Sequence, residues 1–226
     1  MKPAGRAIAA ACAGLALALS SAMGGARADT APVNTTLPTI SGTARDGQAL
    51  SASPGTWSGS GPISYAYQWR RCDSEGAGCA EVAGATGKIY MLSGSDIGWR
   101  MQVAVTASDT SGSTTATSAP TAAVVAAKPV NTSRPSVSGT TRQGETLLGD
   151  AGTWTGTTPI SLAYVWKRCD SAGSNCVAIT GADEPTYTLA AADVGHTLRL
   201  RVYATNIAGT GSSYSAATTI IVEPGR

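Results

Sequence analysis

The sequence has no phenylalanine, only one histidine and few charged residues, which form 13% of its 226 positions. A single imidazole, His196, argues against the hydrolase sites that need a histidine as general base. No Cys-x-x-Cys motif is present, and no acidic cluster has the arrangement expected of a glycosidase or a calcium loop. These absences predict a protein that is not an enzyme and that holds no cofactor or metal.

Basic residues are scattered along the chain and form no basic run. Such a run is typical of proteins that bind nucleic acids or anionic membranes. The formal net charge is +2, but Lys2, Arg6 and Arg27 lie in an N-terminal segment that reads as a leader. Without the leader all 14 acidic residues remain, and the charge becomes +2 − 3 = −1. We therefore expect neither a nucleic acid nor a membrane as partner.

Residues 7–19 form an uncharged apolar run after a short basic start. The run is shorter than the roughly 20 residues that span a bilayer, and residues 26–28 match the pattern that a signal peptidase cleaves. We predict a signal peptide over residues 1–28. A lipoprotein anchored through Cys12 is the alternative, but hardly any apolar segment precedes that cysteine. Residues 223–226 carry no sorting motif, so we expect a secreted protein, released or loosely associated with the cell surface.

After the leader, the chain repeats itself with a shift of 97 positions and without a gap. A Gly-Thr-Trp motif at residues 55–57 returns at residues 152–154, and a tryptophan followed by two cysteines also returns. A period near 100 residues is too long for a solenoid unit and matches a small autonomous domain. We predict two domains, over residues 29–127 and 128–226. The short, proline-containing join between them favours a stiff, elongated pair.

Strand-like alternation of apolar and polar residues is clear at residues 63–69 and 101–107 and in their counterparts in the second copy. Trp69 and Trp166 fall on the apolar face and are predicted core residues. No 3.6-residue apolar stripe occurs beyond the leader. Short strands with turn residues between them predict an all-β fold, a β-sandwich in each copy, with a small barrel as the alternative.

The order Gly-Thr-Trp, Trp-x-x-Cys, Asp-x-Gly resembles that of immunoglobulin-like (Ig-like) domains. More closely, it is similar to the Ig-like repeats of secreted and surface proteins from high-GC Gram-positive bacteria. The resemblance covers nearly the whole chain after the leader and implies two tandem Ig-like β-sandwiches. Asp96 and Asp193 precede the glycine of the last motif, where a carboxylate commonly accepts backbone N–H groups. The chain departs from antibody-type domains because its cysteines cannot form their inter-sheet disulfide.

Each copy carries one Cys-x6-Cys pair. In an oxidising compartment we predict that Cys72 bonds to Cys79 and Cys169 to Cys176. Both other pairings would join the two domains twice, which the duplication disfavours. A zinc site is the alternative, but a spacing of six residues is wider than the usual two to four.

Aromatic side chains are the candidates for ligand recognition, because their faces stack on sugars and peptides while their polar tip remains hydrated. Trp57 and Trp154 lie between glycines, where packing is favoured and surface recognition is the alternative. Trp99 and Tyr203 have no aromatic counterpart in the other copy, so we consider them candidates for exposure.

These observations favour a secreted, monomeric, non-enzymatic Ig-like protein that acts as an extracellular spacer or adhesive module. Its ligand would be an extracellular protein or a polysaccharide. The alternative is a carbohydrate- or cell-wall-binding accessory protein that uses Trp57, Trp154 or Trp99 as a stacking platform.

Overall fold

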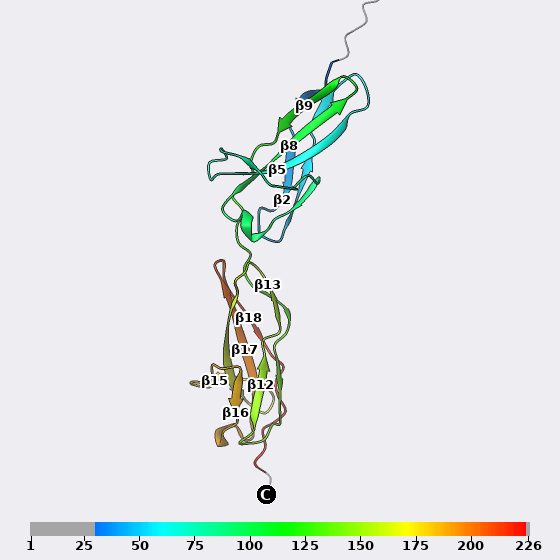
Figure 1. Cartoon of the computed structure of the whole chain (residues 1–226). Helices are drawn as coiled ribbons and strands as arrows, with labels where there is room; N and C mark the ends of the chain where they lie inside the picture. Colours follow the sequence, from blue (N-terminus) through cyan, green and yellow to red (C-terminus); the bar gives the residue numbers. More distant parts are fainter. Residues whose placement is uncertain (1–29, 225–226) are drawn as a thin grey trace, which may run out of the picture.

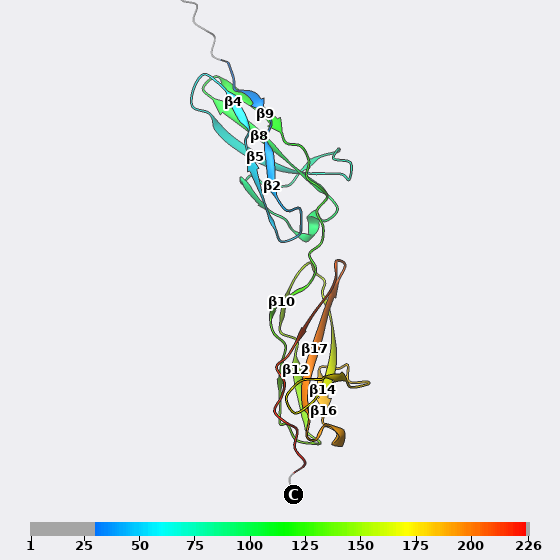
Figure 2. The same cartoon turned by 180° about the vertical axis from the view of Figure 1, so that it is seen from behind.

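A computed structural model describes residues 30–224, so the predicted signal peptide lies outside the described residues. The described chain forms two all-β units arranged end to end (Figure 1), and the view from behind shows the same elongated outline (Figure 2). Every sheet of the described part is built either from strands β1–β9 or from strands β10–β18. The predicted boundary at residues 127 and 128 falls between these two sets.

The first unit consists of short antiparallel strands and one 3-10 turn. Their bounds are β1 (Val33–Thr36), β2 (Thr39–Gly42), β3 (Ala49–Ser53), β4 (Thr56–Ser58), β5 (Ser64–Cys72), β6 (Ala80–Glu81), β7 (Ile89–Met91), η1 (Gly94–Asp96), β8 (Arg100–Asp109) and β9 (Gly112–Thr117). One sheet has the order β2-β3-β7 and the facing sheet β6-β5-β8-β9, while β1 pairs with β4. Two facing antiparallel sheets make a sandwich, with its core between them.

The second unit repeats this arrangement strand for strand. Its elements are β10 (Val130–Ser133), β11 (Ser136–Ser138), β12 (Thr146–Asp150), β13 (Thr153–Thr155), β14 (Ser161–Cys169), β15 (Val177–Ala178), β16 (Thr186–Thr188), η2 (Ala191–Asp193), β17 (Thr197–Asn206) and β18 (Gly209–Tyr214). The sheets are β11-β12-β16 and β15-β14-β17-β18, with β10 paired to β13. The predicted fold class, two tandem Ig-like sandwiches, is confirmed.

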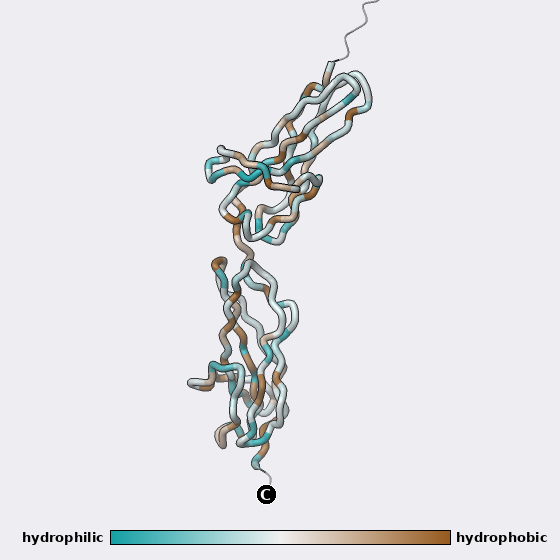
Figure 3. The backbone as a smooth tube through the Cα atoms, viewed as in Figure 1, coloured by the Kyte–Doolittle hydropathy of each residue, from teal (hydrophilic) through white to brown (hydrophobic). Residues whose placement is uncertain are grey.

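The predicted alternation is confirmed along β8 and only in part along β5. Along β8, every second residue from Met101 to Ala107 is fully buried, and the residues between are only partly buried. Along β5, Trp69 is fully buried, whereas Tyr65 at the strand's outer end keeps 39% of its surface exposed. Figure 3 shows the consequence, hydrophobic positions spaced along the strands rather than gathered in one continuous band.

Trp69 and Trp166 lie at the centre of the two cores, as predicted, and neither exposes any surface. Each indole N–H donates to a backbone carbonyl, of Gly87 at 2.8 Å in the first unit and of Glu184 at 3.0 Å in the second. A buried indole therefore keeps its one polar group satisfied, which a tryptophan core position requires.

Both predicted disulfides are present, Cys72–Cys79 and Cys169–Cys176. In each unit the first cysteine ends a long strand and the second precedes a two-residue strand that pairs back onto it. The disulfides therefore close the loops of the β5–β6 and β14–β15 hairpins, which project from the side of each sandwich (Figure 1).

Replacing Cys72 and Cys79 together with alanine is expected to lower the free energy of unfolding of the first unit by about 2–3 kcal/mol, the value for closing so short a loop. Denaturant unfolding followed by circular dichroism measures the change. The transition of the second unit serves as the internal control. An unchanged first transition would show that the hairpin is already fixed without the bond.

Candidate functional site

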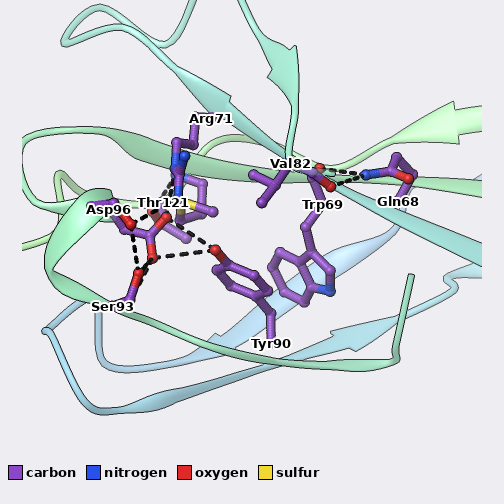
Figure 4. Close-up of polar contacts among 10 residues, drawn as sticks. Gln68, Trp69, Arg71, Val82, Tyr90, Ser93, Asp96 and Thr121 are labelled. Carbon is purple, nitrogen blue, oxygen red and sulfur yellow. Dashed lines mark hydrogen bonds and ion pairs between the residues drawn. The ribbon is translucent and has the colours of Figure 1, made fainter. Parts of the chain in front are cut away.

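Each repeated aspartate lies in a buried polar cluster; Figure 4 shows that of Asp96, beside Tyr90, whose ring stacks on the core residue Trp69. Asp96 is fully buried and accepts hydrogen bonds from the Ser93 amide at 2.8 Å and the Ser93 hydroxyl at 2.9 Å. The Arg71 Nε lies 2.7 Å from Asp96 Oδ1, and the Tyr90 hydroxyl donates to the same carboxylate at 3.1 Å. This carboxylate is thus fully engaged by protein donors and ties η1 to β5 and β7.

The pKa of Asp96 reflects this environment. Burial alone raises the pKa, since it penalises the charged form, but the hydrogen bonds from Ser93 and the ion pair with Arg71 outweigh burial and hold the pKa below its usual value. Burial also raises the pKa of Tyr90, which keeps its proton for donation. The carboxylate of Asp96 therefore stays ionised at neutral pH and holds η1 against β5 and β7.

The second unit contains the same cluster. Asp193 is buried, Arg168 Nη2 lies 2.6 Å from its Oδ1, and the Tyr187 hydroxyl donates to it at 2.9 Å. The sequence predicted that these aspartates accept backbone N–H groups, and the Ala190 amide does so at 2.7 Å. Sequence reasoning missed the arginine partner, although the second basic residue after each core tryptophan is Arg in both copies.

Trp57 and Trp154 are half-buried and pack against the core clusters of their units. Their indole N–H groups donate to the carbonyls of Pro54 at 2.7 Å and Ala151 at 2.9 Å. Both rings therefore pack at the edge of the sandwich, and each indole N–H already has a hydrogen-bond partner. This is the packing role that the sequence favoured over surface recognition.

Trp99 exposes 43% of its surface, more than the half-buried Trp57 and Trp154. Its lack of an aromatic counterpart in the other copy had suggested such exposure. Trp99 directly precedes β8 and so lies at its start. Trp57 lies near the other end of β8, because its ring is 6.5 Å from that of Tyr65, and Tyr65 pairs with Ala107. At about 3.4 Å per strand residue, the seven steps from Arg100 to Ala107 span about 24 Å. Trp57 and Trp99 therefore do not form one stacking platform.

The joint between the units is a polar cluster that sequence reasoning did not identify. Ala127 is held on both sides, because its amide donates to the Thr157 hydroxyl at 2.8 Å and its carbonyl accepts from the Asn206 amide group at 2.7 Å. The Thr157 hydroxyl in turn donates to Asp46 of the first unit at 2.5 Å. Thr157 exposes only 4% of its surface, whereas Asp46 is partly exposed, so the contact is buried on the side of the second unit.

The corresponding residues in the first copy are Ser60 and Asp109. Ser60 is exposed, and Asp109 accepts a hydrogen bond from the Ser60 amide instead of donating one. A carboxylate offers no N–H to a linker carbonyl, whereas the amide of Asn206 does. This difference between the copies is the sequence signal that could have located the joint.

Two further observations concern the described residues. In residues 30–224 no group of three or more His, Cys, Asp or Glu side chains comes together as a metal site would need. No helix of that part of the chain is long and apolar enough to cross a membrane.

Neither a protein-family model nor a curated protein matches the chain. Among solved structures it is similar to the N-terminal four Ig domains of Dscam1 isoform 7.44, with 14% identity and a TM-score of 0.29 over 87% of this chain and 46% of that one. It is also similar to titin domains Z1Z2 in complex with telethonin, with 15% identity and a TM-score of 0.33 over 87% and 98% of the two chains.

A titin I67–I69 variant matches with 13% identity and a TM-score of 0.30, over 87% of this chain and 67% of that one. The chain spans about half the length of the Dscam1 fragment. At such identities and scores the likeness says nothing about function, and the fold follows from the sheets and cores described above.

Proposed function

We propose that this protein is a secreted, non-enzymatic pair of Ig-like domains, residues 29–127 and 128–226, that acts as an extracellular spacer or adhesive module. The observation that carries the proposal is the joint. The buried Thr157 hydroxyl bonds both the linker at Ala127 and Asp46 of the first unit, and these bonds would favour the extended end-to-end arrangement over free swinging on a tether. An elongated pair would set the distance between whatever its first and second units contact.

Export is supported by the leader pattern of residues 1–28 and by the two disulfides, which persist in oxidising compartments. The resemblance of the motifs to repeats in secreted and surface proteins of high-GC Gram-positive bacteria supports the same location. The polar clusters at Asp96 and Asp193 are structural, and they leave the proposal without a catalytic step.

The alternative is a carbohydrate- or cell-wall-binding accessory protein acting through its tryptophans. Trp99 is the residue that supports it, since 43% of its surface is exposed. Trp57 and Trp154 support it less, because each packs against its core with its N–H already bonded.

The Thr157→Val variant tests the spacer proposal. Valine keeps the shape of threonine but removes both hydroxyl bonds, leaving the Ala127 amide and Asp46 without that partner. We expect the wild-type protein to give small-angle scattering of one elongated particle, and the variant to need a mixture of bent forms. The lost bonds should also weaken the joint by about 1–3 kcal/mol.

Ser60→Val is the matched control, because Ser60 occupies the corresponding place in the first copy and is exposed. It should leave the scattering curve unchanged. A wild-type curve that already requires freely bending units would contradict the spacer proposal.

A further inference from the structure

The two copies differ most clearly on the outer face of one sheet, formed by β14, β17 and β18. There the second unit replaces small or neutral residues of the first by basic and aromatic ones. The substituted positions on the sheet are Gln102/Arg199, Ala104/Arg201, Thr106/Tyr203 and Thr117/Tyr214, and Leu37 is replaced by Arg134 in the adjacent segment between β10 and β11. We call Arg134, Lys167, Arg199, Arg201, Tyr203 and Tyr214 the Arg–Tyr face.

Cations and rings alternate on this face. The Arg201 guanidinium lies 4.3 Å from the centre of the Tyr203 ring and 5.0 Å from that of Tyr214, and Lys167 Nζ lies 5.7 Å from the Tyr214 ring. Arg201 and Tyr214 are directly paired across β17 and β18, and Arg201 Nη2 donates to the Ser212 hydroxyl at 3.1 Å. Stacked and hydrogen-bonded, Arg201 is held in place before any ligand arrives.

The positive charge of this face is not neutralised within the described residues. The two ion pairs of residues 30–224 are Arg71–Asp96 and Arg168–Asp193, both on the core side. The Nε atoms of Arg199 and Arg201 are buried and have no hydrogen-bond partner in that part of the chain. Arg70 Nε of the first unit shares this feature, and all three atoms are covered by protein, so a ligand would contact the terminal guanidinium nitrogens instead.

A hollow of about 340 Å³ adjoins the face, lined by Arg134, Arg199, Ser212, Ser213, Tyr214 and Ser215. Guanidinium groups fit carboxylate and phosphate oxygens as a two-pronged fork. Serine hydroxyls both donate and accept, as sugar hydroxyls require, and a tyrosine ring offers a face for stacking. The lining has no aliphatic side chain that would grip an apolar peptide residue.

From this geometry we propose that the Arg–Tyr face binds an anionic polysaccharide, with its carboxylate or phosphate groups on Arg134 and Arg199 and a sugar ring against Tyr214. The inference deepens the proposed extracellular role and rests on it, because it supplies the ligand of the adhesive module. The face lies on the second unit alone, because the first unit has neutral residues at the positions that match Arg134, Arg199 and Arg201.

Arg199→Gln tests the assignment, with affinity measured for immobilised polygalacturonate and for a poly(glycerol phosphate) polymer. The first unit carries Gln102 at this place in the same fold, so the variant is expected to fold, which circular dichroism checks. We expect the wild-type protein to bind at least one of the two polymers, more weakly as salt is raised, and Arg199→Gln to weaken that binding about tenfold, as loss of a charged hydrogen bond does. The two polymers distinguish carboxylate from phosphate as the preferred group.

Arg142→Gln is the matched control, because it removes the same charge from an exposed position in the same unit and should change the affinity less than twofold. Neutral dextran should not bind. Equal binding of dextran, equal loss in both variants, or no binding to either anionic polymer would overturn the proposal. Preferred binding of polyglutamate would also overturn it, in favour of an acidic protein segment. The spacer proposal is judged separately, since Arg199→Gln should leave the scattering curve unchanged.

Discussion

Replacing Trp69 with alanine is expected to lower the free energy of unfolding of the first unit by about 4 kcal/mol, the usual cost of deleting a fully buried tryptophan. Trp69 exposes no surface, stacks on Tyr90 with 5.5 Å between ring centres, and donates its N–H to Gly87. Its removal would leave a cavity between the two sheets and one unpaired carbonyl. Guanidinium unfolding followed by far-ultraviolet circular dichroism measures the loss without depending on tryptophan fluorescence.

Trp57→Ala is the control for this measurement, because that ring is only half-buried at the sandwich edge. It should cost clearly less than Trp69→Ala. Trp166→Ala should in turn destabilise the second unit by a similar amount, since its surroundings are repeated. Similar losses for Trp57 and Trp69 would contradict the central position of Trp69 in the core.

Replacing Asp96 with asparagine is expected to cost the first unit about 3 kcal/mol at neutral pH, as breaking a buried ion pair commonly does. The amide cannot neutralise Arg71, and it cannot accept all the donors that surround the carboxylate. Thermal unfolding at pH 7 measures the loss, and Glu81→Gln, at an exposed position of the same unit, provides the control.

The same substitution should change how stability depends on pH. Burial raises the pKa of Asp96, but the Ser93 hydrogen bonds and Arg71 lower it further, so its folded-state pKa lies below the unfolded value of about 4. The stabilisation is therefore fully present above that pH and is lost as the pH falls through the lower, folded-state pKa. The wild-type unit should lose stability on acidification more steeply than Asp96→Asn. Parallel pH profiles would show that Asp96 does not carry this dependence.

Several features of the molecule could be predicted from the sequence because they depend on neighbours along the chain. The alternation along residues 101–107 predicted the buried face of β8, since successive side chains of a strand point to opposite sides. The gap-free repeat predicted two copies of one fold, and one cysteine pair in each copy of an exported chain predicted the local disulfides. In each case the information lies within a few residues or in one repeated pattern.

The candidate site was predicted only in part. The sequence pointed to Trp57, Trp154 and Trp99 because each aromatic residue can be identified in a sequence without knowing its neighbours in space. Whether a ring is exposed depends on what packs over it, and the structure shows Trp57 and Trp154 against their cores. Tyr203 was noticed as unmatched by the repeat, but its stacking with Arg201 depends on which residues share its face of the sheet.

By itself, then, the sequence determined the strand pattern, the duplication and the cysteine pairs of this protein. Only the tertiary structure decided which distant residues meet: Arg71 with Asp96 across 25 positions, Asp46 with Thr157 across 111, and Arg201 with Tyr214 on one face. The physical reason is that a hydrogen bond or a stacked cation needs two groups within a few ångströms. That closeness is set by strand register and by the docking of two units, which no local pattern specifies.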